Sequence, residues 1–162
     1  MSRFPGIDLQ DKLAWCEEGE RREREFVGSH NITGWGISMN PEKQKDVCAY
    51  DLLGIVPMDL KSIDTQWRDS QAMFGIPPEY AISIGLGALQ RYRKKCPNII
   101  LVLDVLWAGV YTLTIPRAQA LQKAGKAKPH QYEQRKNDTK GNSKVSLIFD
   151  LRDLDEVVCG NS

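Results

Sequence analysis

The chain has 162 residues, 41% of them hydrophobic and 27% charged, which is the composition of one globular domain with a sizeable core. No apolar run reaches the roughly 18 residues of a membrane-spanning helix, and the first residues lack the apolar segment of a signal peptide. Four cysteines without a C-x-x-C pair and only two histidines argue against a zinc finger. We therefore expect a single domain over 1–162, with free thiols, in the cytoplasm.

The first predicted element is a helix over 8–28, where apolar positions recur at spacings of three and four. Glu20 and Glu23 lie on or beside this stripe, whereas Arg22 and its neighbouring arginines are expected to face solvent. A carboxylate on a buried stripe needs a metal ion or a cation as partner. Glu23 fits the stripe better because Phe26 follows at the next helical contact, and Glu20 is the second choice.

The remaining chain predicts short strands and helices in a mixed order. Strands are expected at 33–39, twice within 48–64 with a turn near Gly54, and at 80–84, 98–107, 109–115 and 144–151; helices are expected at 66–76, 87–95 and 116–125; polar loops are expected at 40–46 and 126–143. This mixture predicts an α/β or α+β fold.

Two acids and a lysine in the 48–64 segment are the most informative residues of the sequence. A turn centred on Ile55 places Asp51 across from Asp59, because both are equally far from the centre. Strand alternation puts Asp59 and Lys61 on one face. The bland alternative is a structural triad, in which Lys61 forms an ion pair between the two acids.

Opposed carboxylates repel each other, and a divalent cation reverses that penalty. Mg²⁺ or Mn²⁺ favours carboxylate, carbonyl and water oxygens, so Asp51, Asp59 and the backbone carbonyl of Leu60 are candidate ligands. Glu23 adds a third carboxylate if the first helix packs beside the hairpin. Lys61 can then orient a water molecule or stabilise charge on a phosphate.

The acidic helix, the segment AYDLL and the segment MDLKSIDTQ together resemble the PD-(D/E)XK, or restriction-endonuclease-like, phosphodiesterase superfamily, over about residues 10–105. The resemblance implies a central mixed β-sheet flanked by helices, with a nuclease-like core over 8–105. It also implies a metal-dependent nuclease whose catalytic residues are Glu23, Asp51, Asp59 and Lys61, in a group that includes phage and mobile-element proteins. Tyr50 replaces the usual proline before the first aspartate, and the second acid is aspartate rather than glutamate; the family tolerates both.

Basic residues gather in the second half of the chain. The segment 117–144 carries eight basic and two acidic side chains, and a predicted mobile basic loop spans 126–143. We expect side chains of this segment and of the predicted helix 87–95 to contact the phosphate backbone of DNA. The candidates are Arg91, Arg93, Lys94, Lys95, Lys126, Lys128, Arg135 and Lys136. The alternative is a solvated loop without a partner.

Two rival functions remain open from the sequence. The fold could serve a catalytically inactive accessory or inhibitory protein of a phage or mobile element that binds a host protein or nucleic acid, or a purely structural α/β protein. Divalent-ion binding discriminates both from the nuclease. A nuclease of this size cuts one strand at a time, so the resemblance implies a homodimer for duplex cleavage.

Overall fold

The computed structural model describes residues 12–29, 37–46, 49–132 and 145–157. The helices are α1 (Lys12–Ser29), η1, a 3₁₀ turn (Pro41–Gln44), α2 (Ser70–Phe74), α3 (Leu86–Lys95), α4 (Ile115–Lys123) and η2, a second 3₁₀ turn (Leu151–Asp153). The strands are β1 (Ser38–Met39), β2 (Leu52–Leu53), β3 (Pro57–Ile63), β4 (Ala81–Gly85), β5 (Ile100–Val105), β6 (Gly109–Thr114), β7 (Lys128–Gln131), β8 (Val145–Asp150) and β9 (Asp155–Val157). No helix in these ranges has the length and hydropathy needed to cross a membrane.

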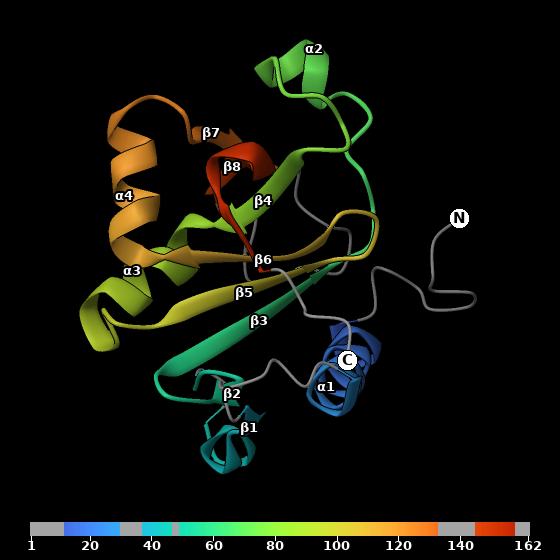
Figure 1. The fold of residues 1–162 in the computed structure, drawn as a ribbon, viewed down its shortest axis with the longest axis vertical. Coiled ribbons are helices and arrows are strands. Elements are labelled where there is room, and N and C mark those ends of the chain that lie inside the picture. Colours follow the sequence, from blue (N-terminus) through green and yellow to red (C-terminus); the bar gives the residue numbers. More distant parts are fainter. Residues whose placement is uncertain (1–11, 30–36, 47–48, 133–144, 158–162) are drawn as a thin grey trace.

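The central sheet is mixed, with strand order β1-β2-β3-β5-β6-β9 (Figure 1). Strand β3 pairs in parallel with β5, and every other pair in this sheet is antiparallel. The apolar run of β5 is buried along almost its whole length, as expected for a strand covered on both faces. The predicted fold class, a mixed α/β fold with a central mixed sheet flanked by helices, is confirmed.

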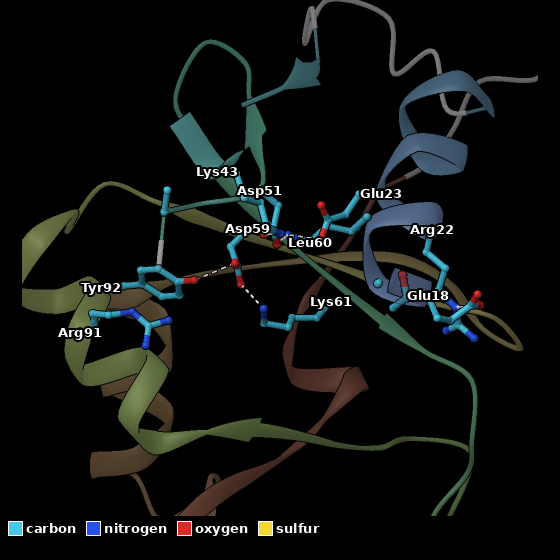
Figure 2. A pocket seen from close by; sticks show the side chains of 13 residues that line it. Glu18, Arg22, Glu23, Lys43, Asp51, Asp59, Leu60, Lys61, Arg91 and Tyr92 are labelled. Atoms are coloured by element: carbon cyan, nitrogen blue, oxygen red, sulfur yellow. Dashed lines mark hydrogen bonds and ion pairs between the residues drawn. The ribbon is translucent and has the colours of Figure 1, made fainter. Parts of the chain in front are cut away.

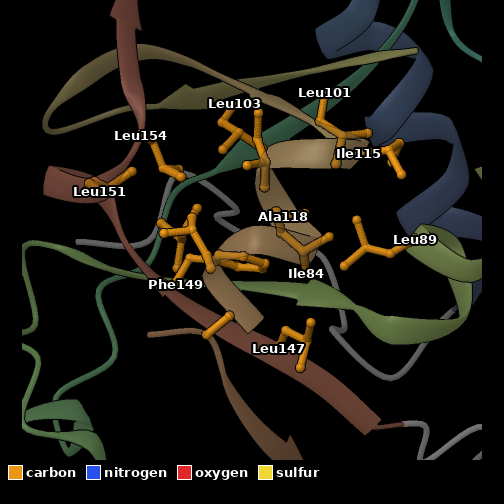
Figure 3. Packing of buried hydrophobic residues seen from close by; sticks show 14 of the residues in the cluster. Ile84, Leu89, Leu101, Leu103, Ile115, Ala118, Leu147, Phe149, Leu151 and Leu154 are labelled. Carbon is orange, nitrogen blue, oxygen red and sulfur yellow. The ribbon is translucent and has the colours of Figure 1, made fainter. Parts of the chain in front are cut away.

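A second, three-stranded sheet in the order β4-β8-β7 covers one face of the central sheet together with α3 and α4 (Figure 1). The main core lies in this layer, where Leu101 and Leu103 of β5 belong to one buried cluster with Ile84, Leu147 and side chains of α4 (Figure 3). Burial of such side chains contributes about 1.5–3 kcal/mol each. This core holds β5 in place, and β5 in turn holds β3, its parallel neighbour in the sheet.

Helix α1 packs on the opposite face of the central sheet (Figure 1). Phe26 of α1 is buried against Leu52, Met58 and Leu60 of the β2–β3 hairpin. The predicted helical stripe therefore reaches the hairpin through Phe26. The packing of α1 next to the hairpin was the condition for Glu23 to join the two aspartates.

Four elements differ from the sequence prediction, among them η2, which was not predicted. The loop expected at 40–46 contains η1, because Asn40 caps the turn and Pro41 starts it. The expected loop 126–143 contains strand β7, whose proline is tolerated because β7 is the edge strand of its sheet; residues 133–143 lie outside the described ranges. Strand β9 was not predicted, since its three residues are mostly polar and pair only with β6.

Candidate active site

The β2–β3 hairpin brings the two aspartates together. Leu52 pairs with Met58, so the hairpin is centred on Ile55, and extending this register by one position puts Asp51, just before β2, opposite Asp59. The register is the one predicted from the sequence. Both carboxylates are buried, with Asp51 5% and Asp59 1% exposed.

Strand β2 ends after two residues, and beyond Met58 this edge of β3 has no strand partner among the described residues. The Asp51 side chain bonds to the backbone at that edge, where its Oδ2 accepts a hydrogen bond of 3.0 Å from the N–H of Leu60. The N–H and C=O of one strand residue point to the same side. The carbonyl of Leu60 therefore faces the same edge as the Asp51 carboxylate, as a metal ligand at this position requires.

The Asp59 side chain also contacts α3. Its Oδ1 accepts a hydrogen bond of 2.7 Å from the hydroxyl of Tyr92, and its Oδ2 is 2.6 Å from Nζ of Lys61 (Figure 2). Burial, together with the charge of Asp59, raises the pKa of Tyr92, so the phenol remains a donor. Lys61 is 40% exposed and reaches from the buried acid to solvent.

Glu23 joins the aspartates through a lysine that the sequence analysis did not single out. Nζ of Lys43 lies 2.6 Å from Oε1 of Glu23 and forms an ion pair with Oδ1 of Asp51 (Figure 2). Burial alone lowers the pKa of Lys43, but the hydrogen bonds to Asp51 and Glu23 outweigh it and raise the pKa. The second oxygen of Glu23, Oε2, is buried and accepts no hydrogen bond from any described residue.

Asn40 determines where Lys43 is placed. The side chain of this buried residue caps η1 by accepting a 3.1 Å hydrogen bond from the N–H of Glu42 and donates to the carbonyl of Tyr50 at 2.8 Å. Its backbone N–H donates to the carbonyl of Asp51 at 3.0 Å. These hydrogen bonds thus hold the turn that carries Lys43 against Tyr50 and Asp51.

The pKa values of the two aspartates are shifted in opposite directions by burial and by their neighbours. Burial, then the neighbouring charge of Asp59, raises the pKa of Asp51 to about 7. Burial also acts on Asp59, but the Lys61 ammonium and hydrogen bonds from Asp51 and Tyr92 outweigh it and lower its pKa. A cation bound beside the two carboxylates relieves the repulsion between them.

A second ionic network lies beside the acidic residues and joins side chains of α1 to Asp64. Glu18 accepts hydrogen bonds from Arg21 at 2.6 and 2.7 Å and from Nε of Arg22 at 2.9 Å, and Arg22 also reaches Asp64 at 3.3 Å. The expectation that Arg22 faces solvent is wrong, because its guanidinium bridges two nearly buried acids. Glu20, the second choice for the helical acid, is 60% exposed and points away from the site.

These residues line one pocket of about 310 Å³. Four acids and four cations form most of its wall: Glu18, Glu23, Asp51 and Asp59, with Arg22, Lys43, Lys61 and Arg91. The Arg91 guanidinium lies 5.0 Å from the centre of the Tyr92 ring, where it can contact a phosphate that enters the pocket.

The other predicted DNA contacts lie elsewhere. Arg93, Lys94 and Lys95 are exposed in the last turn of α3, where positive charge also favours the helix terminus. Lys126 pairs with Asp153 at 2.5 Å, and the ammonium of Lys128 donates to the carbonyl of Phe74. Arg135 and Lys136 lie outside the described residues.

The donor set is suited to a hard divalent cation. Three carboxylates and one carbonyl converge on the pocket, and Oε2 of Glu23 has an unused acceptor position. As the side chains are placed, no three acidic, histidine or cysteine residues of the described ranges are close enough together to share an ion. Lys43 lies between Glu23 and Asp51, so a metal held by all three acids requires that lysine to move.

Sequence reasoning missed four residues of this pocket: Glu18, Arg22, Lys43 and Tyr92. The pair Asn40-Pro41 is a recognisable start signal for a helical turn and could have located η1. No local signal shows where Lys43 points, because that depends on the contact of Asn40 with the strand.

The comparisons with known proteins identify a fold neighbour. No protein-family model and no curated protein sequence matches the chain. Among solved structures, D212, a nuclease from a fusselovirus, aligns with a TM-score of 0.50 and 10% identity, over 94% of this chain and 89% of that one. At this identity the likeness concerns the fold alone.

Proposed function

We propose that the protein is a metal-dependent nuclease of the PD-(D/E)XK type that hydrolyses phosphodiester bonds in DNA. The observation that carries the proposal is the convergence of Glu23, Asp51, Asp59 and Lys61 on one pocket. The fold around that pocket resembles that of a viral nuclease. Three of these side chains are buried carboxylates, and Lys61 reaches from Asp59 to solvent.

In this proposal Asp51, Asp59, Glu23 and the carbonyl of Leu60 hold Mg²⁺ or Mn²⁺. When bound, the metal polarises the phosphoryl oxygen and lowers the pKa of a coordinated water. Burial, then the neighbouring charge of Asp59, raises the pKa of Asp51 to about 7, and a divalent cation would favour the charged form of both carboxylates. Tyr92 holds the Asp59 carboxylate in place through Oδ1 and leaves the opposite oxygen facing Lys61.

Lys61 and the two pocket arginines act on the substrate. The Lys61 ammonium lies beside Asp59 and is partly exposed, so it can hold the attacking water or stabilise charge on the phosphate. Arg91 and Arg22 line the same pocket and supply donors for phosphate oxygens. The water oxygen bonds to phosphorus and gives up a proton, while the bond from phosphorus to the leaving oxygen breaks and that oxygen takes up a proton.

The test compares Mg²⁺-dependent nicking of plasmid, branched and single-stranded DNA by wild type and Lys61→Ala. We expect a loss of about 10²–10⁴-fold in cleavage, the usual effect of a lost acid–base or charge-stabilising group. Metal binding should remain nearly intact, since lysine is no ligand. Lys123→Ala, an exposed lysine of α4, is the matched control and should cleave like wild type.

Two results would contradict this assignment. Equal cleavage by wild type and Lys61→Ala removes Lys61 from the mechanism. A wild type that binds Mn²⁺ but cleaves none of the substrates favours the inactive accessory protein over the enzyme.

A further inference from the structure

We propose that Lys43 is an internal counter-cation that holds the acidic site in its metal-free state and must be displaced when the metal binds. This inference rests on the proposed function, and it assigns to Lys43 a control of the metal concentration at which the site becomes loaded. The observation behind it is the ammonium that joins Glu23 and Asp51, the two acids that a shared metal would have to join.

Both oxygens of Asp51 already have a partner. Oδ2 accepts the backbone hydrogen bond of Leu60, and Oδ1 is paired with Lys43. A metal ion that uses Oδ1 therefore competes directly with the ammonium. At Glu23 the same lysine occupies Oε1, while Oε2 is buried without a partner among the described residues and can accept a metal bond.

The charges favour exchange rather than joint occupancy. Glu23, Asp51 and Asp59 face two cations, Lys43 and Lys61, in the metal-free site. A divalent ion added beside both ammonium groups would turn the excess of negative charge into an excess of positive charge. It would also place like charges in contact in a buried pocket. Release of one ammonium restores the balance.

Lys43 can leave without loss of its anchor. The η1 turn is fixed by the hydrogen bonds of Asn40 to the carbonyls of Tyr50 and Asp51, which involve no atom of the Lys43 side chain. The Lys43 side chain is 22% exposed, so its flexible stem has a path to solvent. The turn thus delivers the ammonium to the site and keeps it nearby after exchange.

The first experiment measures Mn²⁺ affinity by titration calorimetry for wild type, Lys43→Met and Lys45→Met. Lys43→Met keeps an unbranched stem and removes the charge, so Mn²⁺ should bind about tenfold or more tightly, the effect of one close charge pair. Lys45 ends the same turn but is 77% exposed and pairs only weakly with Glu42 at 3.4 Å. Its variant removes the same charge from the chain and should bind Mn²⁺ like wild type.

A second variant guards against loss of folding in Lys43→Met. Asn40→Ser keeps a good capping residue but loses the amide hydrogen bond to Tyr50, so Lys43 is held less firmly. Its Mn²⁺ affinity should lie between those of wild type and Lys43→Met. Equal or weaker binding in both variants, beside a wild type that binds Mn²⁺, overturns the displacement of Lys43 and leaves the proposed nuclease intact.

A third measurement follows the lysine itself in the wild type. Amine acetylation with peptide mapping should show faster modification of Lys43 when Mn²⁺ is added, with Lys45 unchanged as the internal reference. Unchanged labelling of Lys43 at saturating Mn²⁺ contradicts the proposal. Absence of Mn²⁺ binding in wild type and all variants overturns both this inference and the metal site of the proposed function.

Discussion

Replacement of Tyr92 by phenylalanine tests the hydrogen bond that positions Asp59. The hydroxyl donates to Oδ1 at 2.7 Å, and both side chains are buried, so no water readily replaces the lost donor. A hydrogen bond to a charged group contributes about 1.5–3 kcal/mol. We therefore expect Tyr92→Phe to lower the free energy of unfolding by about 2 kcal/mol, with little change in packing.

The assay is urea unfolding at pH 7 in EDTA, supported by thermal melts. For a chain of this size, 2 kcal/mol corresponds to a fall in Tm of about 4–8 °C. Tyr111→Phe is the matched control, because its hydroxyl is 3.4 Å from the carbonyl of Ala108 and contributes little. That variant should stay within about 0.5 kcal/mol of wild type.

The effect should also depend on pH in a defined direction. Tyr92 helps to lower the pKa of Asp59 below its ordinary value of 3.8, so this stabilisation is present above that value and is lost as the pH falls through the folded-state pKa. The difference between Tyr92→Phe and wild type should therefore shrink in acid. A difference below 0.5 kcal/mol at pH 7, or one that is the same at low pH, would refute the reasoning.

Three further predictions concern charge. In EDTA, wild-type stability should fall as the pH rises from about 4 toward 7, because the pKa of Asp51 is raised to about 7 in the folded state; Asp51→Asn should remove that slope in unfolding titrations, and an unchanged slope contradicts it. Arg22→Gln should cost about 3 kcal/mol in urea unfolding because it leaves two nearly buried acids without their shared cation, whereas Arg24→Gln, from an exposed pair, should cost under about 1 kcal/mol. Reversing Lys94 and Lys95 to glutamate should weaken DNA binding at low salt and reduce its salt dependence without changing sequence preference; binding as tight as that of Lys123→Glu would remove the end of α3 from the interface.

The parts of the site that could be predicted from the sequence are those governed by local geometry. The opposition of Asp51 and Asp59 follows from the centre of one short hairpin, and strand alternation separates Asp59 from Leu60. Glu23 could be preferred over Glu20 because a buried phenylalanine follows it at helical spacing. Each of these predictions involves residues fewer than ten positions apart.

The parts that could not be predicted depend on contacts between distant segments. Lys43 reaches the acids because Asn40 bonds to residues ten and eleven positions later, and a polar turn carries no sign of that contact. Tyr92 reads as an ordinary core residue on α3, and only the packing of α3 under β3 shows its hydroxyl against Asp59. Arg22 looks solvent-facing on a helix so rich in charge, until Asp64 is placed beside it.

The parallel pairing of β3 with β5 has a consequence for how the protein acquires its site. Asp59 lies beside Leu101, so the strand that bears the aspartate is secured only after a long intervening stretch of chain has been ordered. Pairings of such high sequence separation slow folding because loop closure comes before the gain in contacts. We therefore expect the pocket to form late in folding, so that divalent ions slow unfolding far more than they accelerate refolding.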